Sequence, residues 1–154
     1  MKLDRGHAEI VRGILYASVI AIGIVVGGCD GGDEIDYGFG PEENWSTVST
    51  ADRTWHILWR PIPASMPTLE PFSVEIKVFD QAGRTPGDDV SVMIDATMPH
   101  HGHGMNVVPE VTRSADSWLA EGVLLHMPGR WEFAIDVERD GEVERAQWTE
   151  ELES

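Results

Sequence analysis

Residues 98–105, with the sequence MPHHGHGM, concentrate side chains that bind soft metal ions. Three histidines and two methionines fall within these eight residues. A thioether favours Cu(I) and an imidazole accepts Cu(I), Cu(II) or Zn(II), so this mixture is typical of a copper site. On an extended chain, His101 and His103 point to one side about 6.6 Å apart, a span that two imidazoles can bridge around one ion. The segment therefore predicts copper binding, and the alternative is a polar, glycine-rich turn that holds no ion.

His126 and Met127 form a second pair of the same residue types. They end a predicted strand, where neighbouring side chains point to opposite faces, so at most one of them is expected to face the 98–105 segment. In the alternative interpretation, Met127 packs in the core and His126 lies on the surface beside a hairpin. His56 stands alone on a strand face and is expected to be structural.

Other kinds of chemistry have little support in the sequence. Cys29 is the only cysteine and few carboxylates lie near the histidines in sequence, so a structural zinc site of the Cys/His type is not expected. We find no Ser/His/Asp ordering, nucleophile elbow, phosphate loop or HExxH motif, and the carboxylates are scattered. An enzyme is therefore the least favoured class of protein.

The elements that must position the ligands are strands, because apolar residues alternate with polar ones from Thr54 onward. This period of two predicts strands over 55–59, 72–78, 90–96, 118–126, 131–137 and 143–148. They indicate an all-β domain, an antiparallel immunoglobulin-like sandwich of about seven strands with negligible helix. The predicted core contains Val74, Ile76, Val92, Ile94, Trp131, Phe133 and Ile135.

Two turns are predicted to close hairpins. The segment Met127-Pro128-Gly129-Arg130 is expected to join two paired strands, because proline fixes φ and glycine allows a positive φ. Asp140-Gly141 is a strong hairpin motif, with residues 143–148 as the returning strand.

The N-terminus is typical of an exported lipoprotein. Its apolar run over residues 14–26 reaches only about 20 Å as a helix, short of the roughly 30 Å that a membrane span needs, which favours a signal peptide. Val26-Gly27-Gly28-Cys29 resembles a lipobox, so Cys29 is the predicted lipidation site. The alternative is a stray thiol behind an ordinary secretory signal.

Three parts of the chain follow from this interpretation. Residues 1–28 are the predicted lipoprotein signal peptide, and residues 29–52 are an acylated cysteine with a flexible tether rich in Gly, Asp and Glu. Residues 53–154 form the predicted β-sandwich domain. The expected location is the cell envelope, with a lipid anchor at Cys29 and the domain facing the periplasm or the cell surface.

Charge narrows the set of partners. The chain has a formal net charge of −16, and without residues 1–28 it keeps 8 Lys and Arg against 25 Asp and Glu. Such a field repels nucleic acid and anionic headgroups and attracts cations, so no nucleic-acid partner is expected. The acidity alternatively serves only to keep a surface protein soluble.

Three segments resemble the YtkA-like domain family, which is related to the FixH group. They are ATMPHHGHGM over residues 96–105, Pro109-Glu110-Val111, and GVLLHMPGRWE over residues 122–132. The chain departs from the family pattern at Trp118, where tyrosine is common, and at the extra His100. The resemblance covers about residues 70–138 and implies an immunoglobulin-like β-sandwich linked to copper handling or respiratory-complex assembly. It carries over the metal-ligand candidates Met98, His101, His103, Met105 and Met127.

The sequence thus leads to two hypotheses for function. In the first, the domain binds copper through the His/Met loop for buffering, delivery or respiratory-complex assembly. In the second, it is a metal-free module that binds another protein of the cell envelope.

Overall fold

The computed structural model describes residues 44–153. The predicted signal peptide, the lipidation site Cys29 and the predicted tether as far as residue 43 lie outside the described residues. Within the described range, no helix has the length and hydropathy that crossing a membrane requires.

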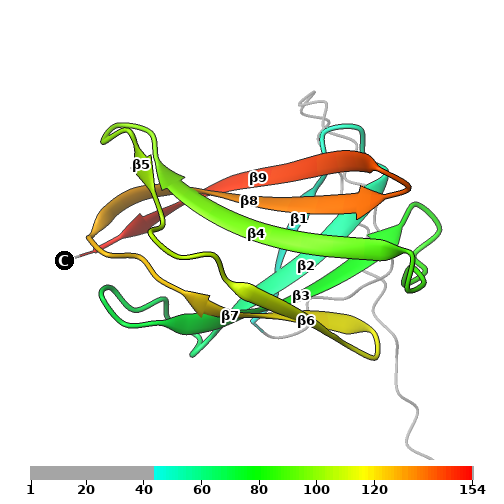
Figure 1. The fold of residues 1–154 in the computed structure, drawn as a ribbon, viewed down its shortest axis with the longest axis horizontal. Helices are drawn as coiled ribbons and strands as arrows, with labels where there is room; N and C mark the ends of the chain where they lie inside the picture. Colours follow the sequence, from blue (N-terminus) through cyan, green and yellow to red (C-terminus); the bar gives the residue numbers. More distant parts are fainter. Residues whose placement is uncertain (1–43, 154) are drawn as a thin grey trace, which may run out of the picture. The chain divides into compact units, whose positions relative to one another are not determined.

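Nine strands in residues 44–153 form two antiparallel sheets (Figure 1). One sheet has the order β1 (Ser46–Ser49), β2 (Trp55–Ile62), β3 (Phe72–Asp80), β7 (Ser117–Val123) and β6 (Glu110–Ser114). The other has the order β5 (His103–Gly104), β4 (Val90–Met98), β8 (Gly129–Arg139) and β9 (Glu142–Leu152). The predicted all-β antiparallel sandwich is confirmed.

The core lies between the sheets, where every second side chain of the long strands is buried. All seven residues of the predicted core are buried, each 5% exposed or less. Three aromatic rings stack across the two sheets, with Trp148 of β9 lying 4.5 Å from Trp59 of β2 and 5.2 Å from Phe133 of β8, between ring centres. The period-two pattern arises because one face of each strand is covered by the opposite sheet.

One predicted hairpin is confirmed and the other is wrong. Asp140 and Gly141, with φ of 55° and 84°, close the two-residue turn between β8 and β9. By contrast, β7 pairs with β3 and β6 while β8 pairs with β4 and β9, so the chain over residues 124–128 crosses from one sheet to the other. A proline and glycine between two strands indicate a change of direction, but they do not determine whether those strands pair.

The sheet begins inside the range predicted for the tether. β1 pairs with β2 over Ser46 to Ser49, and Thr50, which is 2% exposed, follows directly. The Thr50 hydroxyl donates to Glu144 Oε2 at 2.8 Å and accepts from the Trp55 backbone N–H at 3.2 Å. These bonds connect the start of the described chain to the edge strand β9.

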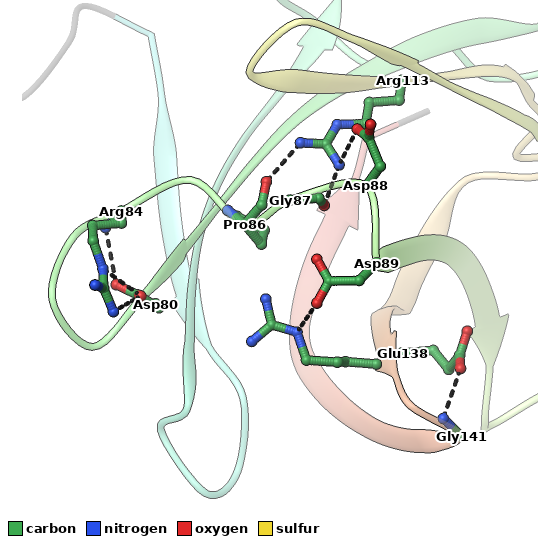
Figure 2. A network of polar contacts seen from close by, with 10 residues as sticks. Asp80, Arg84, Pro86, Gly87, Asp88, Asp89, Arg113, Glu138 and Gly141 are labelled. Atoms are coloured by element: carbon green, nitrogen blue, oxygen red, sulfur yellow. Dashed lines mark hydrogen bonds and ion pairs between the residues drawn. The ribbon is translucent and has the colours of Figure 1, made fainter.

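At the end of the sandwich where β4 begins, Arg113 of β6 holds the preceding loop (Figure 2). Its guanidinium donates to the carbonyl oxygens of Pro86 and Gly87 and pairs with Asp88 at 3.3 Å. The same group lies 4.7 Å above the centre of the Trp118 ring. Arginine suits this position because its planar fork donates several bonds while stacking on an aromatic face.

Two further ion pairs lie at this end of the molecule (Figure 2). Arg139 Nε lies 2.9 Å from Asp89 Oδ2, and Arg84 Nε donates to Asp80 Oδ2 at 2.9 Å. The hydrogen bond from the Arg84 side chain holds the pKa of the Asp80 carboxyl below its ordinary value. We call residues 80–89 together with Arg113 and Arg139 the ion-paired end.

Candidate metal centre

The segment predicted to bind copper forms a tight turn at the opposite end of β4 (Figure 1). The carbonyl oxygen of Met98 accepts hydrogen bonds from the backbone N–H groups of His101 and Gly102, both at 3.0 Å. Gly102 has a φ of 70°, a conformation that glycine adopts without a steric penalty. The turn therefore reverses the chain directly after Met98 and returns it along the edge of β4.

The returning chain places His103 beside Met98. β5 pairs with β4 so that His103 lies opposite Met98, and residues opposite each other in an antiparallel pair share one face of the sheet. Met98 is 1% exposed and His103 is half-buried, so this face is the inner one. At Gly104 a Cβ would lie 3.1 Å from the Ala96 carbonyl oxygen, which explains why a residue without a side chain stands there.

His126 joins His103 from the segment that crosses between the sheets. The two half-buried imidazole rings have centres 4.8 Å apart and planes inclined by 41°. The alternative interpretation, in which His126 lies on the surface beside a hairpin, does not hold, because His126 is half-buried and the adjoining strands do not pair. The sequence argument treated residues 126 and 127 as strand neighbours on opposite faces, whereas neither belongs to a strand.

Trp131 forms the floor beneath the histidine pair. Its side chain is fully buried, and its ring centre lies 5.4 Å from that of His126 and 6.2 Å from that of His103. Its indole N–H donates to the carbonyl oxygen of Met127 at 3.0 Å. A strand residue thus fixes both the position of the imidazoles and the backbone that carries one of them. We call His103, His126 and Trp131 the histidine cluster.

The Nδ1 atoms of His103 and His126 are buried, and neither has a hydrogen-bond partner within residues 44–153. Burying an unpaired polar nitrogen costs roughly 1–3 kcal/mol, so such an atom in a native protein requires an explanation. A metal ion supplies one, because imidazole nitrogen is a common metal ligand. An ion about 2.0–2.1 Å from each nitrogen lies roughly 3 Å from each ring centre, which separates two ligating rings by about 4.5–6 Å. The 4.8 Å spacing of His103 and His126 fits this range.

The predicted thioether ligands lie around the same end. Met98 and His103 both line a shallow hollow of about 270 Å³. The Met98 methyl carbon lies 3.0 Å from where a Cβ on Gly129 would stand, so the Met98 side chain extends to the start of β8. Met105 and Met127 are half-buried and pack against the hydrophobic core.

His101 differs from the other candidates because its side chain is exposed. Its ring centre lies 5.7 Å from that of His103, so the structure brings these two predicted ligands together. Within residues 44–153, no set of three or more His, Cys, Asp or Glu side chains forms a group that could by itself hold a metal ion. The thioether candidate Met98 lies opposite His103 in the same sheet.

The sequence contains a cue that would have identified His126. His126 lies within the segment GVLLHMPGRWE, which also contains Trp131 and Met127. The carried-over ligand set took Met127 from this segment and left His126 out.

His56, expected to be structural, forms a hydrogen bond with the Ser49 hydroxyl at 2.9 Å. Burial, followed by the charge of Arg53, lowers the pKa of His56.

A carboxylate lies beside Trp131 on the neighbouring strand. Glu150 of the edge strand β9 is the register partner of Trp131 and is half-buried. Burial raises the pKa of the Glu150 carboxyl above its ordinary value.

No family model matches the chain, and no curated protein matches it. Among solved structures, it is similar to a DUF4426 family protein from Pseudomonas aeruginosa PAO1, with 12% sequence identity and a TM-score of 0.49. The match covers 71% of this chain and 94% of the other. Residues 44–153 of the chain are all-β, with two antiparallel sheets.

Proposed function

We propose that this chain is an envelope lipoprotein, anchored through Cys29, whose sandwich domain binds copper at the histidine cluster. The ligands are His103 and His126, with sulfur from Met98 and from Met105 or Met127. Binding serves to buffer copper or deliver it to an envelope partner, in keeping with the resemblance of residues 70–138 to YtkA-like domains. The anchor is motivated by the lipobox-like sequence before Cys29, which lies outside the described residues.

One observation carries the copper proposal: the buried and unpartnered Nδ1 atoms of His103 and His126, on rings only 4.8 Å apart. Nothing in residues 44–153 donates a hydrogen bond to these nitrogens or accepts one from them. The rigid floor of Trp131 limits how far His126 can move to find a partner. A preformed pair of ligands reduces the ordering cost that an ion would otherwise impose on binding.

The surroundings favour a soft cation over a hard one. The site offers imidazole and thioether groups, whereas Mg²⁺ and Ca²⁺ prefer carboxylate, carbonyl and water oxygen. Mixed nitrogen and sulfur ligation without a thiol suits Cu(I), and histidines also accept Cu(II). The strongly acidic chain, with a net charge of −16, attracts either ion over a distance.

The decisive experiment measures how much copper stays on the protein after desalting. The full chain should carry Cys29→Ser, so that a free thiol does not bind the ion. It is loaded with Cu(I) under anaerobic reducing conditions and, separately, with Cu(II) in air. We expect the parent to retain about one copper per chain in at least one condition. His126→Ala and His103→Ala should each lose most of it.

His100→Ala is the matched control, because His100 is an exposed histidine on the same turn and is not part of the histidine cluster. It should retain as much copper as the parent. Far-UV circular dichroism of His126→Ala should match that of the parent, since His126 lies outside the strands. His103→Ala should also keep the parent spectrum, because β5 contains only two residues. A parent that retains no copper in either condition would refute the proposal.

The second candidate function is a metal-free interaction module. Leu69 is 71% exposed, and its backbone N–H donates to the Leu125 carbonyl oxygen at 2.8 Å, beside His126. Val108, in the loop that follows the turn, is 94% exposed. These apolar side chains could contact another envelope protein. Absence of copper from the parent chain would favour this function.

A further inference from the structure

We propose that His101 is the exchange ligand of this site: copper enters and leaves through His101, and His126 holds it. The inference rests on the proposed function and assigns different roles to two histidines that flank a third. His103 is the residue that they share.

The three imidazoles form a series from solvent to the interior. His101 is exposed, His103 and His126 are half-buried, and behind them Trp131 is fully buried. Successive ring centres are 5.7 Å apart from His101 to His103 and 4.8 Å apart from His103 to His126. Both spacings fall within the roughly 4.5–6 Å that two imidazoles bound to one ion require.

His101 combines a fixed backbone with a free side chain. Its N–H donates to the Met98 carbonyl oxygen at 3.0 Å, so the turn sets its position relative to Met98 and His103. The exposed ring remains able to rotate toward solvent or toward His103. His126 has the opposite character, because its ring lies against Trp131 and its Nδ1 is buried.

This arrangement provides a path for ligand exchange. An ion held by His103, His126 and the thioether sulfurs would have to lose a ligand before water or a competing chelator could reach it. His101 can bind the ion together with His103 while His126 releases it, so the ion keeps two imidazole ligands during the exchange. The intermediate lowers the barrier in both directions and leaves the difference in free energy between bound and free ion nearly unchanged.

The test separates rates from equilibrium in the full chain carrying Cys29→Ser, with Cu(I) as the probe under anaerobic conditions. A chromogenic Cu(I) chelator such as bicinchoninate withdraws copper from the loaded protein in a stopped-flow instrument. The same chelator at lower concentration measures the affinity by competition. We expect His101→Ala to slow withdrawal by at least about tenfold while changing the affinity by less than about threefold.

Two variants bracket this result. His100→Ala removes a neighbouring exposed imidazole, and the chelator should withdraw copper from this variant at the same rate as from the parent. His126→Ala should lose affinity, since it removes a holding ligand. The exchange role is overturned if His101→Ala releases copper at the parent rate, or if it loses stoichiometric binding. In both cases copper binding by the parent still stands. A parent that binds no copper overturns this inference and the proposed function together.

Discussion

The two ends of the sandwich differ in how many hydrogen bonds their polar side chains make. At the ion-paired end, Arg113 donates to two backbone carbonyl oxygens and pairs with Asp88. Arg139 forms an ion pair with Asp89, although its buried Nε makes no hydrogen bond among the described residues. In the histidine cluster, two buried imidazole nitrogens have no partner among the described residues. Hydrogen-bonded polar groups contribute to stability, whereas unpartnered buried ones reduce it. The arginines of the ion-paired end therefore contribute to stability, and the copper proposal assigns the unpaired nitrogens of the histidine cluster to binding.

The core beneath the histidine cluster should produce the largest effect. We expect Trp131→Ala to lower the free energy of unfolding of the full chain by about 3–5 kcal/mol, because it empties a fully buried site. Copper retention should be lost as well, since His126 loses the ring against which it packs. Urea unfolding and copper analysis measure the two effects. Trp118→Ala, a buried tryptophan beside Arg113, should also destabilise the protein but leave copper retention intact.

Removing the arginine at the ion-paired end should give an intermediate effect on stability alone. Arg113→Ala deprives the Pro86 and Gly87 carbonyl oxygens of their donor and uncovers the Trp118 ring. We expect the free energy of unfolding to fall by about 1–3 kcal/mol, as measured in urea. Copper retention should equal that of the parent. A loss of copper here would show that the two ends are coupled.

At the histidine cluster, a substitution should not lower the free energy of unfolding as it does at the ion-paired end. His126→Phe keeps a ring against Trp131 and removes a buried, unpartnered nitrogen. In the metal-free chain we expect the free energy of unfolding to stay unchanged or to rise by up to about 1 kcal/mol, while copper retention falls. A clear loss of stability without metal would mean that this imidazole has a structural role, which contradicts the comparison of the two ends.

The smallest effect concerns the half-buried carboxylate beside Trp131. Burial raises the pKa of Glu150, so its ionised form destabilises the folded protein at neutral pH. Glu150→Gln should therefore raise the free energy of unfolding at pH 7, by about 0.5 kcal/mol. The difference in the free energy of unfolding between Glu150→Gln and the parent should disappear as pH falls below about 4.3, where the carboxyl of the parent is protonated in both folded and unfolded chains. Urea unfolding at the two pH values tests this.

The strands that the sequence predicted are those with one face against the opposite sheet. Alternation over residues 72–78 and 90–96 identified β3 and β4, because burial of one face imposes the period. β1 was missed because Ser46–Ser49 offers a single apolar residue, Val48, which is only half-buried. β1 is a strand because it pairs with the edge of β2, and its own residue pattern does not reveal that pairing.

The ligand loop was predictable from composition, whereas the close approach of His126 to that loop was not. Residues 98–105 attract notice because five potential ligands are concentrated there. His126 lies 23 positions further along the chain than His103 and approaches it only because residues 124–128 cross between the sheets. Such a crossing depends on which strands pair, a long-range property that no local pattern contains.

The brevity of β5 has a consequence for hydrogen exchange. Only two residue pairs join it to β4, whereas eight join β4 to β8. The amide of Met105, bonded to the Ala96 carbonyl oxygen, can thus exchange through a local opening that leaves the core intact, while the amide of Ile135 requires a much larger unfolding event. The loop that carries His101 and His103 has a low opening free energy of its own, independent of the melting of the domain.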